Sequence, residues 1–306
     1  MKLNMYRHAV GAGSLVALGL LASPALATGP LPSLAPASDF AILALGGTIS
    51  ANGQATINSS TSILGDVGYG AYTSSTTNQK VDLLVGTVWV SSTANFSYTP
   101  ATYAPTGGIR FGTGLAGDPV DAKLNAATAI AISMGPIFGA LTPTLSLGAL
   151  SSNAVITSTG DVNVISISSV SYNSNALTLH SRPGHTDTFV LNVSGNFDFA
   201  QSDILLSGTD ASHVLFNFTG ANAQITVNKS NTTFNGTILA PLIGQSVIYH
   251  NPATFNGAIY AYNINLHSDF NINHAGFVPS PAGAWLLGAA GLMGLRRRRV
   301  PARGAM

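Results

Sequence analysis

The sequence predicts a mainly β protein, a β-solenoid with one helix packed alongside. Two segments repeat at fixed offsets: residues 234–240 are echoed 21 residues later by 255–261, and 191–195 are echoed 25 residues later by 216–220. Repeats of this length that carry strands and a turn indicate stacked coils, because one coil cannot bury its inward face alone. The chain has no cysteine and only 8% charged residues. Burial and backbone pairing must therefore hold the fold together without disulfides.

Residues 1–27 have the pattern of a secretory signal peptide. Lys2 and Arg7 precede a short apolar run, and Ala25 and Ala27 form a small-residue cleavage site. The mature chain is therefore expected to begin at residue 28, with residues 28–37 as an extended, proline-containing arm. An uncleaved N-terminal anchor is the alternative.

The body of the chain, residues 38–277, begins with an apolar run at 40–45 that predicts a first buried strand closed by two glycines. A sharp turn is expected at Gly65. Residues 69–114 are rich in Thr, Ser and Tyr, and strands are expected there, with a loop at 98–108. For this stretch the sequence does not distinguish a solenoid from a β-sandwich.

A helix is predicted to follow Asp118, a good N-cap, with Pro119 at the first helical position. Gly135 and Pro136 are expected to end it. The polar face of this helix is thin, so we expect it to lie along a sheet. Its apolar side chains follow the spacing of one buried face, namely Val120, Leu124, Ala127, Ile130, Ala131 and Met134.

From residue 149 to 277 the pattern is β throughout. Apolar and polar residues alternate with period two, and turn residues recur every several positions. Stacked asparagines at the turns are expected to form hydrogen-bonded ladders, which would explain the many asparagines. The alternative is a β-sandwich in which the repeated hairpin signals are a coincidence.

The body is acidic once the signal peptide and the C-terminal arginines are set aside. Eleven aspartates and no glutamate stand in it, although the whole chain has a formal net charge of +1. A basic surface is absent from this composition, which argues against nucleic acid as a partner. The positive side chains of the body are Lys80, Arg110, Lys123, Arg182 and Lys229.

The sequence contains no recognisable catalytic or cofactor motif. A Gly-x-Ser-x-Gly elbow, phosphate-binding glycine loops and calcium-binding glycine repeats are all missing. His250, His267 and His274 have a spacing that fits no metal motif. We therefore assign no catalytic, cofactor-binding or metal-binding residue, and the sequence does not predict an enzyme.

The densest group of ionisable residues is His180, Arg182, His185 and Asp187. This group could hold a metal ion or an acidic group of a polysaccharide. A polar loop between two strands is the simpler interpretation, and we favour it.

The C-terminal segment 278–299 resembles a sorting signal in its layout. A motif of Val278, Pro279, Ser280 and Pro281 is followed by an apolar run at 283–295, and then by Arg296, Arg297, Arg298 and Arg299. The 13-residue run reaches about 20 Å as a helix, against about 30 Å for a bilayer core, so it spans only marginally. The arginines and residues 300–306 are expected to stay in the cytoplasm, which places the body in the periplasm.

The second half of the body also resembles a known family. Residues 214–218, 234–241 and 255–261 resemble the choice-of-anchor A domain, an adhesive domain of bacterial surface proteins. The resemblance implies a right-handed β-helix with a helix alongside. Residues 38–43 look like the start of the related bacterial ice-binding β-solenoids.

The tail resembles a PEP-CTERM sorting signal, with Ser280 where glutamate is most usual. This resemblance implies an exosortase-type membrane protease as a partner, transient anchoring of the C-terminal helix in the inner membrane, and cleavage near Pro279 and Pro281. The protein would then reach the cell surface or the extracellular matrix.

The favoured function is therefore a non-enzymatic surface or matrix protein that adheres to exopolysaccharide or surface glycans. Ice binding is the alternative, but Thr-x-Thr occurs only in isolation, at 142–144 and 186–188. A polysaccharide-active enzyme using Arg182 or Asp187 is a third hypothesis.

Overall fold

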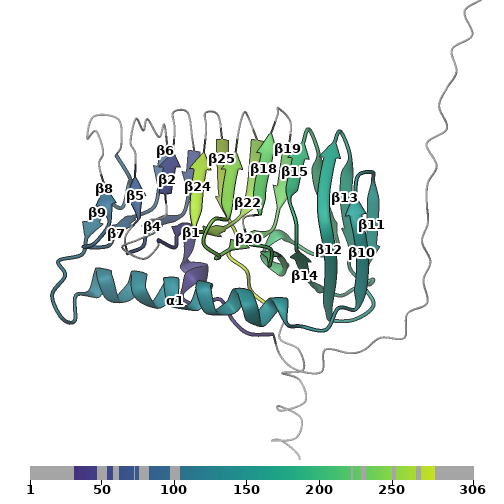
Figure 1. Ribbon diagram of the computed structural model, residues 1–306, viewed down its shortest axis with the longest axis horizontal. Coiled ribbons are helices and arrows are strands. Elements are labelled where there is room, and N and C mark those ends of the chain that lie inside the picture. The colour runs from purple at the N-terminus through teal and green to yellow at the C-terminus, as the bar shows by residue number, and fades with distance from the viewer. Residues whose placement is uncertain are drawn as a thin grey trace, which may run out of the picture.

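The fold is an elongated solenoid of parallel strands with a long helix along one side (Figure 1). The computed structural model describes residues 31–46, 54–57, 62–71, 73–75, 83–96, 104–221, 223–228, 232–249, 253–266 and 270–279. The predicted signal peptide therefore lies outside the described residues, as does most of the predicted sorting signal.

The coils have three faces, and each face is a row of parallel strands. Face A consists of β10 (Leu145–Leu150), the first half of β12 (Val162–Asn173), β14 (Thr188–Val193), β17 (Val214–Phe218), β20 (Thr237–Ala240), β23 (Ile259–Ala261), β1 (Phe40–Ala44), β4 (Asp66–Tyr69), β7 (Val88–Val90) and β9 (Ile109–Phe111).

Face B follows face A around each coil. It consists of the second half of β12, β15 (Phe197–Ala200), β18 (Gln224–Asn228), β21 (Ser246–Tyr249), β24 (Asn263–Leu266), β2 (Gln54–Ile57), β5 (Ser74–Ser75) and β8 (Asn95–Phe96). Because the long strand β12 pairs with both β14 and β15, it joins faces A and B into one sheet.

Face C closes the coil as a separate sheet. It consists of β11 (Ala154–Thr157), β13 (Ala176–His180), β16 (Asp203–Ser207), β19 (Thr232–Asn235), β22 (Ala253–Gly257), β25 (Phe270–His274), β3 (Ser62–Leu64) and β6 (Leu83–Val85). Short 3-10 helices stand at Ala37–Asp39 and Ala211–His213.

The order of coils in space differs from the order along the chain. The first coil, β1 to β3, lies in the middle of the solenoid, and the coils up to β9 extend from it toward one end. The chain then returns at the opposite end with β10 and winds back until β23, β24 and β25 pair with β1, β2 and β3. We call this junction of the first and last coils the seam.

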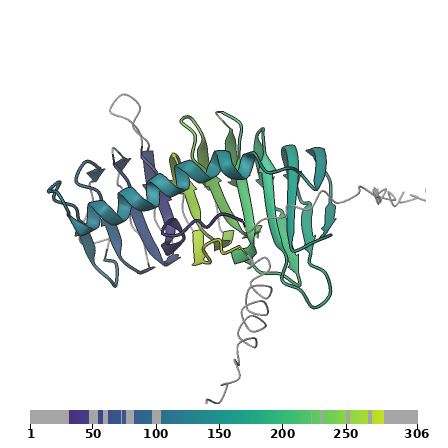
Figure 2. The same cartoon turned by 90° about the horizontal axis from the view of Figure 1, so that it is seen from below.

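Helix α1 (Pro119–Gly139) carries the chain from one end of the solenoid to the other (Figure 2). The predicted N-cap is confirmed, since the Asp118 carboxylate accepts hydrogen bonds from the amides of Val120 and Asp121, both at 2.9 Å. The predicted end at Gly135 and Pro136 is wrong.

The helix continues to Gly139 because side chains of the sheet hold its last turns. Asn217 Nδ2 donates to the carbonyl of Gly135 at 3.0 Å, and Asn192 Nδ2 donates to that of Phe138 at 2.9 Å. The Phe138 side chain is also completely buried. These contacts stabilise the last turns of the helix by more than is lost because Pro136 has no backbone N–H to donate.

Two apolar cores stabilise this arrangement. One fills the interior of the coils and contains a stack of aromatic rings, in which Phe234 and Phe255 lie 5.0 Å apart and nearly parallel. The other lies between α1 and face A and buries Val120, Leu124, Ala127 and Ala131 as predicted.

Both predicted repeats are confirmed as neighbouring coils. Asn235 pairs with Asn256, and Leu191 pairs with Phe216, at the offsets that the sequence indicated. The described strands between residues 69 and 114 also belong to the solenoid, as β7 pairs with both β4 and β9. The β-sandwich alternative is therefore wrong.

Candidate functional site

A ladder of asparagine side chains crosses face C. Asn256 Nδ2 donates to Asn235 Oδ1, and Asn273 Nδ2 donates to Asn256 Oδ1, both at 2.8 Å. Asn235 Nδ2 ends the ladder on the carbonyl of Ile204 at 2.6 Å. Each rung stands at the end of a strand in register with the next, so the coil spacing of about 4.8 Å sets the repeat of the ladder.

Glycines allow the coils to turn directly after two rungs. Gly236 and Gly257 have φ of 137° and 154°, which L side chains rarely adopt. A Cβ on Gly257 would lie 1.9 Å from the carbonyl oxygen of Gly236, so the stacked turns require glycine. The ladder is thus held by the same turns that shape the coil.

A second polar row runs beside the ladder on face C. Thr233 pairs with Thr254, Thr254 with Asn271, and Asn271 with Ser62. These side chains are half-buried or exposed and, like those of the ladder, uncharged. We call the two rows together the amide face; it comprises Ser62, Thr233, Thr254, Asn271, Asn235, Asn256 and Asn273.

The borders of the amide face differ from its centre. Leu64 continues the ladder row next to Asn273 and is 40% exposed, and Leu205 on β16 is 46% exposed. Asp203 pairs with Thr233 and accepts a hydrogen bond from its backbone amide at 2.9 Å. The amide face is therefore an uncharged polar strip with aliphatic residues at its edge and one carboxylate at its β16 side.

Face B is less regular among its described residues. One outward row, Gln224, Ser246 and Asn263, is polar and uncharged, but the row beside it in register is Ser171, Asp198, Thr226, Ile248 and Asn265. It therefore mixes a hydroxyl, a charge and an aliphatic side chain from one coil to the next. A repetitive ligand would find a repeating surface on face C rather than here.

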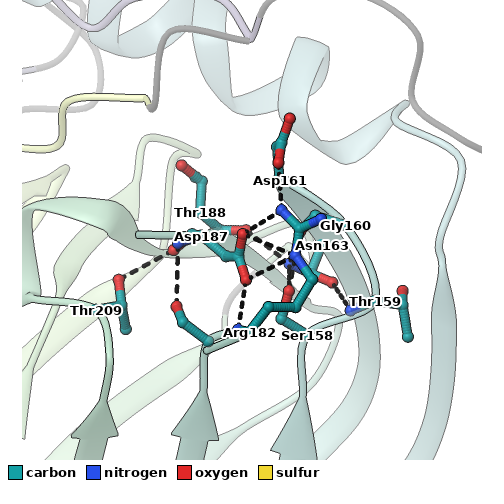
Figure 3. Close-up of polar contacts among 10 residues, drawn as sticks. Ser158, Thr159, Gly160, Asp161, Asn163, Arg182, Asp187, Thr188 and Thr209 are labelled. Atoms are coloured by element: carbon teal, nitrogen blue, oxygen red, sulfur yellow. Dashed lines mark hydrogen bonds and ion pairs between the residues drawn. The ribbon is translucent and has the colours of Figure 1, made fainter. Parts of the chain in front are cut away.

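The group His180 to Asp187 forms a salt-bridged turn between β13 and β14 (Figure 3). The Arg182 guanidinium bonds both the Asp187 carboxylate, at 2.6 Å, and the Asp161 carboxylate of the neighbouring coil. Asp187 also accepts from the Arg182 backbone amide at 2.8 Å, and its carbonyl accepts from Thr209 Oγ1 at 2.9 Å. The predicted polar loop between two strands is confirmed.

Electrostatics in this turn follow from burial and pairing. Burial alone would raise the pKa of Asp187, whose side chain is 1% exposed, but hydrogen bonds from Arg182 outweigh it and lower the pKa. The hydrogen bond to Asp187 raises the pKa of Arg182 further above its ordinary value. Both groups therefore stay charged at neutral pH.

The same turn brings together three side chains of metal-ligand type. Ligand atoms of Asp161, His185 and Asp187 lie within 4.8 Å of one another. The guanidinium of Arg182 already pairs with both carboxylates, and it occupies acceptor sites that a cation would use. The chemistry of the group fits a bridge between coils better than a metal site.

The other histidines of the described chain do not form a cluster. Among the described residues, His213 contacts Asp210 at the end of a 3-10 helix, with Nδ1 3.0 Å from the carboxylate. His274 ends β25, where burial lowers its pKa. His250 and His267 lie outside the described residues.

Two residues of the predicted sorting motif, Val278 and Pro279, end the described chain. Val278 is 55% exposed, and its amide donates to the carbonyl of Ser212 at 2.8 Å. None of the helices in the described part of the chain is long and apolar enough to cross a membrane. The other predicted sorting and cleavage residues lie outside the described residues, namely Ala25, Ala27, Ser280, Pro281, Arg296, Arg297, Arg298 and Arg299.

Comparison with protein families identifies the domain. A family model described as an ice-binding-like adhesive domain matches residues 17–273. The chain belongs to this family. No curated protein matches this adhesive domain.

Solved structures share the fold of the adhesive domain. An ice-binding protein from the Antarctic ascomycete Antarctomyces psychrotrophicus is 20% identical, with 81% of this chain and 98% of that chain covered and a TM-score of 0.53. An ice-binding protein from an Arctic yeast is 20% identical, with coverage of 82% and 96% and a TM-score of 0.52. One from an Antarctic biological consortium is 18% identical, with coverage of 80% and 91% and a TM-score of 0.52.

The sequence indicated part of the amide face. It identified the repeat that contains Asn235 and Asn256, and the expected ladder is confirmed there. It did not identify Asn273 as the third rung, because the last coil is shorter and lacks the Phe-Asn-Gly pattern. The alternation of Phe270, Asn271, Ile272 and Asn273 was the available signal.

Proposed function

We propose that this adhesive domain is a non-enzymatic, exported surface or matrix protein that binds polysaccharide through the amide face. The ladder carries the proposal. Each carboxamide has two N–H donors and an oxygen with two lone pairs, and the ladder uses only one of each on Asn256. The remaining donors and acceptors repeat from coil to coil in fixed orientation, as hydroxyl groups do along an extended glycan.

The composition of the amide face supports a glycan over other partners. Its side chains are neutral hydrogen-bonding groups bordered by exposed leucines, and sugars combine hydroxyl groups with apolar ring faces in the same way. Because the ladder fixes its asparagines before binding, little side-chain entropy is lost on association. The partner expected from the sorting signal, an exopolysaccharide or surface glycan, fits this surface.

The ends of the chain support export and sorting. We propose that residues 1–27 direct secretion, that 278–299 form a PEP-CTERM-like signal on a choice-of-anchor A domain, and that an exosortase-type protease cuts near Pro279 and Pro281. A mature matrix protein that still carried Arg296 to Arg299, detected by mass spectrometry, would contradict the cleavage.

Removing two hydroxyl groups from the amide face tests the binding surface. Thr233→Val together with Thr254→Val keeps β-branched side chains of similar shape but removes two hydrogen-bonding groups. Binding to the exopolysaccharide of the producing cells, measured by co-sedimentation, should weaken about tenfold or more. Thr226→Val on face B is the matched control and should bind normally. Equal binding by all three proteins would exclude the amide face.

Ice binding is the second candidate, and two observations favour it. The solved structures compared above are ice-binding proteins, and the amide face repeats Thr-x-Asn on adjacent coils at Thr233 and Thr254. An ice-recrystallisation assay on the same variants decides between the candidates. If the unmodified protein inhibits ice recrystallisation and the double valine variant does not, ice binding is favoured. If the unmodified protein does not inhibit it, glycan binding remains the proposed function.

A further inference from the structure

An apolar groove opens beside the C-terminal end of α1, away from the amide face. It has a cavity volume of about 380 Å³. Gly135, Gly139 and Ala140 line the helix side, and Phe218, Pro241 and Leu242 line the sheet side. A Cβ on Gly135 would lie 2.5 Å from Cγ of Pro241, and one on Gly139 would lie 3.0 Å from Cγ2 of Thr219, so both glycines let the helix pack closely on the floor of the groove.

Two exposed aliphatic residues follow groove-lining residues in the sequence. Ile137 follows lining residue Pro136 in the chain and is 44% exposed, and Ile243 follows Leu242 and is 58% exposed. None of the groove-lining residues is ionisable. An apolar groove of this kind can accept an apolar segment.

The described chain ends beside the C-terminal part of α1. The Phe277 ring packs edge-on against Phe138, with 5.8 Å between the ring centroids, and Phe277 is only 1% exposed. Phe138 directly precedes lining residues Gly139 and Ala140. The chain therefore leaves the body beside α1 near the start of β17, where the Val278 amide donates to the Ser212 carbonyl, and the groove lies at the other end of that strand.

The chain that follows has the composition to fill the groove. Residues 283–295 are uncharged and apolar, and Trp285 is the first large side chain after Val278. Seven residues reach at most about 25 Å, which is more than the helix diameter of about 10–12 Å. Trp285 can therefore reach the groove from the anchored Phe277 without unfolding any strand.

We infer that the groove at the end of α1 is a docking site for the apolar tail of the same chain, with Trp285 as its anchor. Docking covers Leu242, and it holds the segment around Ser280 between two fixed points, Phe277 and the groove. Because the tail is only marginally long enough to cross a bilayer, the groove and the membrane compete for it. The tail is favoured over a second copy because its attachment point gives it a high effective concentration.

The absence of cysteine makes the docking directly measurable. In the full chain, Ala140→Cys with Ala284→Cys introduces the only possible disulfide. We expect it to form within single chains, with a yield that does not change on dilution. Adding Trp285→Ser, or Leu242→Ser in the groove, should reduce the rate of disulfide formation about tenfold, because the anchor or its apolar contact is lost.

Helix α1 also provides the control position. Ala122 is exposed like Ala140 but lies roughly 27 Å away along the helix axis. Ala122→Cys with Ala284→Cys should form little disulfide. The inference is overturned if this pair reacts as well as the Ala140 pair, if Trp285→Ser leaves the Ala140 pair unchanged, or if the disulfide forms only between chains. None of these results affects glycan binding by the amide face.

Discussion

Asp187 shows how a single residue connects three coils. Its carboxylate pairs with Arg182, which also reaches Asp161 on the preceding turn, and its carbonyl accepts a hydrogen bond from Thr209 on the next. The side chain is 1% exposed, so the pair replaces hydration that the carboxylate has lost.

Asp187→Asn should lower the free energy of unfolding by about 2 kcal/mol, because Arg182 loses a charged hydrogen-bond partner but keeps Asp161 and is 31% exposed. The pKa of Asp187 is lowered in the fold, so its contribution is present above the unfolded value of 3.8 and is lost as the pH falls further. Urea unfolding at several pH values tests this. The variant should lose less stability between pH 5 and about 2 than the unmodified protein; parallel curves would contradict the account.

At the scale of elements, turns and strands were easier to predict than helix ends. The echo of residues 234–240 in 255–261 gave the register of β19 and β22 directly, because a solenoid stacks sequence repeats on each other. The end of α1 could not be predicted, since it depends on Asn192 and Asn217 of face A, which are 53 or more residues away from the helix. Local sequence shows only that Gly135 and Pro136 weaken a helix.

The stacked turns give a prediction at the element scale. Gly257→Ala should destabilise the fold by about 3 kcal/mol, since the new Cβ meets the Gly236 carbonyl and the φ of 154° is unfavourable. Gly148→Ala on β10 is the matched control, because a Cβ there contacts nothing within 4 Å. The control should change stability by less than about 1 kcal/mol. Similar melting temperatures for the two variants would show that the turns can relax.

The whole molecule depends on the seam, where the first and last coils meet. Sequence reasoning predicted coils but could not place β1 beside β23, because no local pattern records which distant coils are neighbours. The choice is made by burial: β1 is completely buried between β4 and β23 and beneath α1. The amide face depends on this order too, since Asn273 pairs with Leu64 across the seam.

A disulfide that joins the first and last coils across the seam should stabilise the protein more than a disulfide between two coils of the C-terminal half. Ala44 and Ala261 are paired neighbours across the seam, and Ala240 and Ala261 are paired neighbours within the C-terminal half. A cysteine pair at the first site closes a loop about ten times longer, which corresponds to about 5 rather than 3 kcal/mol. Thermal unfolding with and without reductant measures the stabilisation by each of the two disulfides. Equal gains would indicate that the unfolded halves already lie close together.

The position of Phe277 also decides how the molecule would lie if its uncleaved tail held it at a surface. The ring is buried against Phe138, so the chain leaves the body on the side of α1, partway along the solenoid instead of at one end. A protein held by its tail would lie with the long axis of the solenoid parallel to the surface and with α1 facing that surface. Faces B and C then tilt outward together, and every coil of the amide face is at a similar height for a partner arriving from outside.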